Sequence, residues 1–179
     1  ILQGMAIKYA CAHWRRSMPR GMGTLYWQLN DCWPVAGWAS IDYYHRWKAL
    51  HYMAKKFYAP LLVSGLEDPK SGTVEVHLTH DGLAARDLTL KWSVTDAQGL
   101  MLDCGTKKVR AGKNCKRSVH TVRVECLLEK QRTRNCLVLI EMYGGRTPVG
   151  DDMVAFARPK RLELCSQPRI SSKISGSGT

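Results

Sequence analysis

The side chains best suited to binding chemistry gather in one short segment, "GTLYWQLNDCWPVAGW", which covers residues 23–38. It holds three indoles, an amide and a carboxylate: Trp27, Trp33, Trp38, Asn30 and Asp31. Indoles stack on flat or apolar ligand faces, whereas amide and carboxylate groups make directional hydrogen bonds. Such a concentration of stacking and hydrogen-bonding groups raises the question of what ligand the segment would meet.

Two helices and a strand are expected to position this segment. Apolar residues at spacings of three and four predict a helix over residues 1–17, with a stripe of Leu2, Met5, Ala6, Tyr9, Ala10 and His13. Residues 24–29 read as a strand buried on both faces, with Leu25 and Leu29 inside and Trp27 pointing toward its C-terminal end. A second helix is predicted from Ser40 to Tyr58, with Asp42 as a plausible N-cap and Pro60 as the terminator. The order helix, strand, loop, helix is typical of α/β folds.

The pattern changes from about residue 61 onward. Short β-branched runs such as "TVEVHLTHDG" and "CLVLIEMYGG" end in turn residues, and no helical stretch separates them. Strands at this spacing predict an antiparallel two-layer sandwich over residues 70–165, with Trp92 and Val94 on its inner layer. The Ser- and Gly-rich tail that follows is expected to be a linker or the start of a further β domain.

Composition excludes several protein classes. With 45% hydrophobic and 23% charged residues, the chain is globular rather than disordered. No apolar run approaches the ~20 residues that a membrane-spanning helix needs. The chain opens on Ile1 rather than methionine and shows no signal peptide, which suggests a piece of something longer. Its seven cysteines include no C-x-x-C pair, which argues against structural zinc and favours reduced, mostly buried thiols in an intracellular protein, although the compartment stays open.

The net charge of +12 is concentrated in one region. Between Asp103 and Asn135 there are ten Lys or Arg residues against three acids. Such a region suits an anionic partner, or it is the solvated face of a sheet and its loops. The solvated face is favoured and no nucleic-acid partner is expected, because no aromatic residue interleaves with these cations as single-strand binding requires.

Residues 23–60 resemble the closing segment of the catalytic barrel of β-mannosidases in glycoside hydrolase family 2. The matching motifs are Trp27-Gln28-Leu29-Asn30-Asp31, Trp33-Pro34, Gly37-Trp38, Asp42-Tyr43 and Lys48-Ala49-Leu50-His51-Tyr52. "FARPKRLEL", Phe156–Leu164, also resembles the end of the sandwich domain that follows the barrel in that family. Two positions depart from the pattern: Gly37 stands where Ser is usual, and His45 where Gly is usual.

The resemblance implies an α+β chain with three parts. Residues 1–60 would be the last helix–strand–helix of a (β/α)8 barrel, residues 61–165 an immunoglobulin-like β-sandwich, and residues 166–179 a linker or further domain. The loop after the last barrel strand would then lie at the active-site face. An indole covers the apolar face of a pyranose while Asn and Asp reach its hydroxyls, so the expected substrate-binding residues are Trp27, Asn30, Asp31 and Trp33. For Trp38 and Trp47, packing is favoured over substrate contact.

The resemblance also implies a retaining exo-β-mannosidase that releases terminal β-linked mannose from oligosaccharides. Retaining glycosidases use two carboxylates about 5 Å apart. By resemblance both are glutamates upstream of Ile1, whereas residues 1–60 contain no glutamate and only Asp31 and Asp42 as acids. We therefore expect no catalytic residue, metal or cofactor in this chain. The expected partners are the rest of the barrel and a mannoside or oligosaccharide, without nucleic acid or membrane.

Two other functions stay open at this point. One is a stand-alone β-sandwich interaction module, basic on one face, with residues 1–60 as an unrelated helical attachment. The aromatic motif counts against this alternative, because nothing in such a module explains it. The other is a family 2 relative that cleaves a different β-glycoside, since one strand of a barrel does not decide sugar identity.

Overall fold

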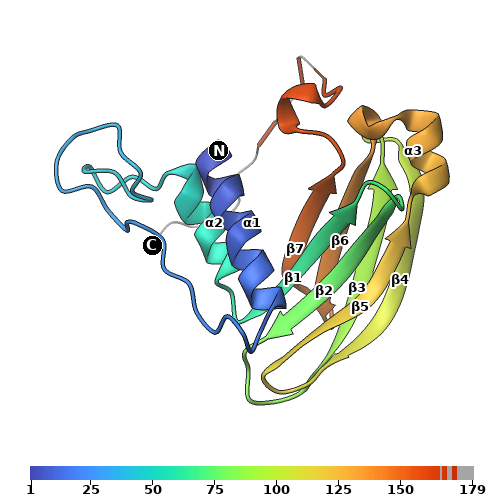
Figure 1. Ribbon diagram of the computed structural model, residues 1–179, viewed down its shortest axis with the longest axis horizontal. Coiled ribbons are helices and arrows are strands. Elements are labelled where there is room, and N and C mark those ends of the chain that lie inside the picture. Colours follow the sequence, from blue (N-terminus) through green and yellow to red (C-terminus); the bar gives the residue numbers. More distant parts are fainter. Residues whose placement is uncertain (166, 169–170, 173–179) are drawn as a thin grey trace.

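The computed structural model describes residues 1–165, 167–168 and 171–172, and Figure 1 shows two helices beside a two-layer β-sandwich. The two helices are α1 (Leu2–Arg16) and α2 (Ala49–Phe57). The strands that follow are β1 (Leu61–Asp68), β2 (Thr73–His80), β3 (Arg86–Thr95), β4 (Met101–Ala111), β5 (Cys115–Arg123), β6 (Leu137–Gly144) and β7 (Thr147–Ala155). Shorter helical elements are α3 (Glu125–Gln131), η1 (Thr133–Asn135) and η2 (Pro159–Arg161). The linker or further domain expected over 166–179 lies almost wholly outside the described residues.

The sandwich consists of two antiparallel sheets that enclose one apolar core. One sheet has the strand order β1-β2-β5 and the other β4-β3-β6-β7, and every pairing within them is antiparallel. Both sheets contribute fully buried side chains to the core, among them Val74, Val76, Leu78, Leu90, Val94, Val138, Ile140 and Met142. The antiparallel two-layer sandwich predicted from the strand spacing is confirmed, but the expectation that no helical stretch separates the strands is wrong, because α3 lies between β5 and β6.

Alternation along β2 and β3 explains how the core forms. Val74, Val76 and Leu78 are completely buried, while the residues between them point to the outer face of the sheet. On β3, Val94 is also completely buried. Trp92 is half-buried against the same core and stacks on His120 with ring centroids 5.7 Å apart. The predicted inner-layer positions of Trp92 and Val94 are therefore confirmed.

The predicted first helix is confirmed, but it buries a different face. Gly4, Cys11 and Ala12 are its buried residues. At Gly4 the two helices approach so closely that a Cβ there would lie 2.5 Å from the Met53 sulfur. The predicted stripe is largely uncovered by the described residues, because α1 packs through its small residues against the Leu50, Ala54 and Phe57 side of α2.

The predicted strand over 24–29 is wrong, because this segment is irregular in the structure. A strand needs hydrogen-bonded neighbours, and no strand among the described residues pairs with residues 24–29. The side chains differ as well: Leu25 is fully exposed and Leu29 more than half exposed, although both were expected to be buried. Trp27 does not point into a barrel mouth but lies open to solvent.

The second helix begins at Ala49, and its predicted start near Asp42 is wrong. The Asp42 carboxylate accepts hydrogen bonds from the backbone N–H groups of Tyr44 and Arg46 at 2.9 Å each, which closes a turn. Within that turn His45 has φ 64°, the left-handed conformation that favours glycine. A helix cannot continue through such a residue, so α2 starts after the turn. The Gly-to-His departure noted in the sequence falls on this position.

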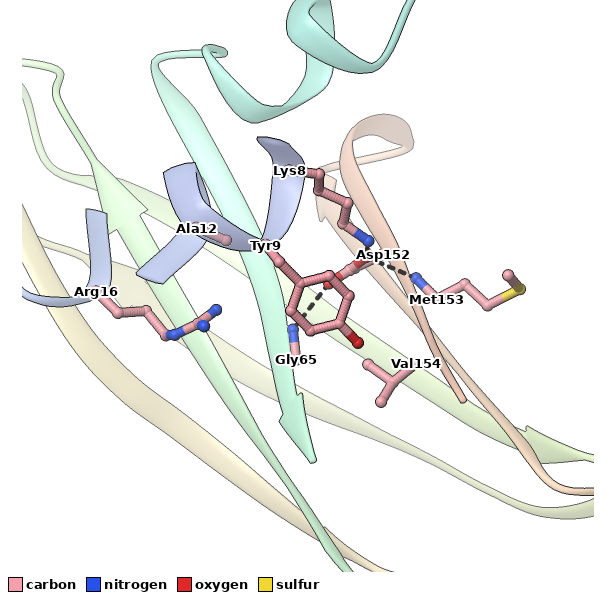
Figure 2. Close-up of a pocket in the computed structure, with 8 residues that line it drawn as sticks. All are labelled: Lys8, Tyr9, Ala12, Arg16, Gly65, Asp152, Met153 and Val154. Atoms are coloured by element: carbon pink, nitrogen blue, oxygen red, sulfur yellow. Dashed lines mark hydrogen bonds and ion pairs between the residues drawn. The ribbon is translucent and has the colours of Figure 1, made fainter. Parts of the chain in front are cut away.

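The helices and the sandwich are joined by a polar junction, shown in Figure 2. Asp152 of β7 is buried, forms an ion pair with Lys8 of α1, and accepts a hydrogen bond of 2.9 Å from the Gly65 N–H of β1. Arg16 of α1 donates to the Ser64 hydroxyl at 3.0 Å. A buried carboxylate that loses a partner is strongly destabilising, so α1 is an integral part of the fold rather than a loose attachment.

The cysteines differ in part from expectation. All seven thiols are free. Cys11 and Cys136 are buried, whereas four of the seven are exposed: Cys32, Cys104, Cys126 and Cys165. Burial raises the pKa of the Cys136 thiol to about 11. The expectation of unpaired thiols agrees with the structure, but the expectation that most are buried is wrong, because several lie on loops and strand edges.

Candidate functional site

The candidate site is the long loop between α1 and α2, here called the aromatic loop and defined as residues 23–48. Figure 1 shows it extending from the helices, away from the sandwich. Its four indoles all lie substantially open to solvent: Trp27, Trp33, Trp38 and Trp47. Large apolar side chains that gather at a protein surface mark a binding or interaction site. The four exposed indoles therefore make this loop the candidate site.

Backbone hydrogen bonds fold the aromatic loop back on itself. The Ile41 N–H donates to the Leu29 carbonyl at 2.8 Å, and the Asp31 N–H donates to the Ile41 carbonyl at 3.0 Å. The Lys48 N–H then donates to the Ser40 carbonyl at 2.9 Å. These bonds bring the two ends of the loop together, so the segment that carries Trp33 and Trp38 projects from a closed base.

Asp31 and Lys48 form an ion pair at that base. The Lys48 ammonium donates to Asp31 Oδ2 at 2.6 Å and to the Gly37 carbonyl at 3.2 Å. The Asp31 side chain is only 4% exposed, and that of Lys48 is 27% exposed. A Cβ on Gly37 would lie 2.6 Å from Asp31 Oδ1, so the loop wraps tightly around this carboxylate. In this structure Asp31 therefore holds the loop together through its ion pair with Lys48.

A second polar cluster surrounds Ser40, which is completely buried. Its hydroxyl donates to the Leu29 carbonyl at 2.9 Å, shares a hydrogen bond of 2.8 Å with the Tyr26 hydroxyl, and lies 3.1 Å from His51 Nδ1. Serine beside histidine can serve as a nucleophile and base. Here the hydroxyl proton is used by a backbone carbonyl and no solvent reaches the serine, so the cluster fixes the loop onto α2.

The sequence-predicted site residues separate into two environments. Trp27, Asn30 and Trp33 are exposed, whereas Asp31 is buried. The Asn30 amide donates to the Asp31 carbonyl at 3.4 Å, a long bond that leaves most of its capacity free. Trp38 and Trp47, for which packing was favoured, are also exposed. Trp47 nevertheless contacts His51 and Tyr52, with ring centroids 4.4 Å and 5.2 Å apart.

The residues that hold the loop are not predictable from the sequence pattern. Lys48 enters that pattern only within the motif Lys48-Ala49-Leu50-His51-Tyr52, Ser40 only as the expected start of the second helix, and Tyr26 only within the expected strand. The Asp31–Lys48 contact joins positions 17 residues apart in a loop without periodicity, and no spacing rule signals such a pair.

The described residues show no metal site at the loop, and its acids are Asp31 and Asp42. In this part of the chain no group of three or more His, Cys, Asp or Glu side chains is arranged to hold a metal ion. Likewise, none of the described helices has the length and apolarity that a membrane crossing requires. The exposed groups of the aromatic loop are indoles and an amide, which stack and form hydrogen bonds.

Comparison with known proteins places this geometry in context. Residues 72–161 match a family model described as the mannosidase Ig/CBM-like domain. Beta-mannosidase A of Aspergillus fumigatus is 31% identical over 169 residues, which cover 87% of this chain and 18% of that protein. The chain thus spans about a fifth of the length of this curated relative.

Solved structures share the fold. The crystal structure of a beta-D-mannosidase from Dictyoglomus thermophilum superposes with a TM-score of 0.78 at 24% identity, over 90% of this chain and 19% of that one. The Amycolatopsis orientalis exo-chitosanase superposes with a TM-score of 0.70 at 20% identity, over 86% and 18%. At this level of identity the likeness concerns the fold, and it includes the helices as well as the sandwich because it covers most of the chain.

Proposed function

Because this chain belongs to the mannosidase Ig/CBM-like domain family, we propose that it forms part of a retaining exo-β-mannosidase of glycoside hydrolase family 2. In this proposal residues 1–60 are the last helix–strand–helix of the catalytic barrel. Residues 61–165 are the immunoglobulin-like domain that follows it, and residues 166–179 are a linker or the start of a further β domain. The substrate is an oligosaccharide with a terminal β-linked mannose.

The observation that carries the proposal is the exposed aromatic loop. The four indoles and the stripe of α1 are apolar surfaces that the described residues leave largely open to solvent. In a completed barrel, the neighbouring elements and the sugar would cover them. The irregular 24–29 segment is consistent with the same account, since it would pair as a strand only when parallel neighbours lie on both sides.

Within this site each residue has a distinct role. Trp27 and Trp33 supply flat apolar surfaces for the C–H face of a pyranose, and Asn30 supplies an amide for its hydroxyls. Asp31 acts through its ion pair with Lys48, which holds the loop in the conformation that presents those groups. The two carboxylates that a retaining mechanism needs are supplied by the rest of the barrel. This chain therefore binds and positions the sugar but carries no catalytic residue.

The test is the Trp27→Ala substitution in the full-length protein, assayed with an aryl β-mannoside. Loss of the stacking surface should lower kcat/KM by about tenfold, which corresponds to roughly 1.4 kcal/mol of transition-state binding. Because Trp27 is 73% exposed, the fold should survive its removal.

The matched control is Trp14→Ala, which removes an indole of α1 that is 45% exposed and lies outside the aromatic loop. It should leave kcat/KM within about twofold. An unchanged kcat/KM in the Trp27 variant, or equal losses in both variants, would remove Trp27 from the sugar site.

A further inference from the structure

The strongest concentration of charge in the chain lies away from the aromatic loop. Residues 101–123 carry seven cations against one acid, Asp103. This segment alone contributes a net charge of +6, half of the +12 of the whole chain. All seven cations are exposed: Lys107, Lys108, Arg110, Lys113, Lys116, Arg117 and Arg123. The proposed sugar chemistry makes no use of any of them.

The fold brings these cations onto a single edge of the sandwich. β4 is the edge strand of one sheet and β5 the edge strand of the other, and a short turn joins them. The register pairs Lys107 with the fully buried Leu90, so Lys107 starts from the inner face of its sheet. Its ammonium donates to the Val119 carbonyl of β5 at 2.9 Å. One lysine side chain therefore spans the gap, and the two edge strands form a common surface, here called the basic edge (residues 101–123).

The basic edge presents charge on both outer faces and at its tip. On β4, Lys108 lies opposite Thr89 on the outer face of the four-stranded sheet. On β5, Lys116 lies opposite Thr79 on the outer face of the other sheet. Lys113 occupies the connecting turn. At about 3.3 Å per residue, the 11 residues of β4 give the edge a length of about 35 Å.

Most of this charge is not neutralised within the chain. Arg110 contacts Asp87 at 3.3 Å, but both side chains are more than 70% exposed, so the pair is weak. Among the residues that the structure describes, Lys113, Lys116, Arg117 and Arg123 have no carboxylate within 4.0 Å. Edge strands are commonly protected from pairing with another chain by a lysine. Lys107, whose side chain starts from the inner face of its sheet, already serves that purpose. Four further free cations exceed what protection requires.

We propose that the basic edge binds a linear anionic polysaccharide, one whose repeated sulfate or carboxylate groups pair with Lys and Arg along β4 and β5. A narrow strip of point charges matches an extended polymer with regularly spaced anions. Single-stranded nucleic acid fits less well, because residues 101–123 contain no Trp, Tyr or Phe on which a base would stack. Figure 1 shows β4 and the aromatic loop at opposite ends of the molecule, so both surfaces are accessible at once.

The test measures binding of a sulfated heparin hexasaccharide to the full chain by calorimetry at several salt concentrations. The triple variant Lys113→Gln, Lys116→Gln, Arg117→Gln should weaken binding at least tenfold and flatten its salt dependence, because fewer ions pair with the polymer. The control variant Lys55→Gln, Lys70→Gln, Lys160→Gln removes the same charge from exposed positions outside the edge. It should change the affinity by less than twofold. A neutral hexasaccharide should not bind.

Each contrary result overturns the proposal. Equal losses in both triple variants would mean that net charge alone attracts the polymer. Tighter binding of single-stranded or duplex DNA of equal charge, or of anionic vesicles, would replace the polysaccharide as the partner. A basic-edge variant that self-associates but still binds the hexasaccharide like the wild type would assign these cations to edge protection.

Discussion

The aromatic loop depends on one buried carboxylate more than on any of its indoles. Asp31 receives the Lys48 ammonium, while the same ammonium reaches the Gly37 carbonyl. Three points of a loop without regular secondary structure are thereby fixed together. Because Asp31 is buried, its charge is compensated by this contact rather than by water. Because this base is closed, the loop can present Trp27, Asn30 and Trp33 to a ligand.

Replacing Asp31 by Ala should therefore loosen the loop. The partly buried Lys48 ammonium would keep only its weaker partner, the Gly37 carbonyl. The free energy of unfolding should fall by about 1–3 kcal/mol. Amide hydrogen exchange should accelerate across residues 31–48 while the strands of the sandwich keep their protection.

The comparison for that experiment is Asp87→Ala, which breaks the exposed pair with Arg110. It should cost less than about 0.5 kcal/mol and leave exchange in the aromatic loop unchanged. Equal exchange in wild type and the Asp31 variant would show that the ion pair does not hold the loop.

The sequence predicts residue types at the site better than their surroundings. Trp27, Asn30 and Trp33 could be nominated because stacking and hydrogen bonding follow from the side chain itself. The exposure of Leu25 and the burial of Asp31 could not be predicted from the sequence, because both depend on which segments pack around the loop. The ion pair of Asp31 joins distant positions for which no local pattern exists.

At the scale of elements, prediction succeeded where the partners of an element lie nearby in the chain. Strands such as β2 and β3 alternate clearly, and each pairs on one side with the adjacent strand in the chain across a short turn, so the antiparallel sandwich was predictable. The segment 24–29 has no such partner among the described residues, and its apolar composition alone does not make a strand. The start of α2 was missed because the hydrogen bonds of Asp42 and the left-handed His45 form a turn that periodicity does not reveal.

The packing of α1 against β2 should make stability depend on pH. His77 of β2 is half-buried, with Glu75 on its own strand, Arg16 on α1 and Lys116 on β5 nearby. Burial is the largest influence and lowers its pKa below the ordinary 6.5, the two cations lower it further, and Glu75 opposes them only in part. The unfolded chain then binds more protons than the folded one just below pH 6.5, so stability should fall as the pH drops through that window.

Thermal unfolding at pH 7.5 and 5.5 measures this dependence. The wild type should lose more stability at the lower pH than His77→Gln does, since the variant lacks the buried imidazole. His13→Gln, which removes an exposed imidazole of α1, serves as the matched control. Equal losses in the wild type and His77→Gln would show that this histidine does not couple the α1 interface to pH.

At the scale of the whole molecule, two surfaces with different chemistry lie at opposite ends (Figure 1). The aromatic loop offers flat apolar groups and an amide, and the basic edge offers a strip of cations. The sandwich and the Lys8–Asp152 junction hold the helices that carry the loop. In the proposed parent enzyme, the aromatic end completes a sugar site.

The central claim is that this chain supplies a binding surface to a β-mannosidase without supplying its catalytic carboxylates. Hydrolysis of an aryl β-mannoside, measured in parallel for the full-length protein and for the isolated 179-residue chain, tests that claim most directly. The account predicts turnover by the full-length protein and none above background by the isolated chain, because it places both carboxylates of the retaining mechanism in the rest of the barrel. Turnover by the isolated chain, or a full-length protein inactive on the β-mannoside, would contradict it.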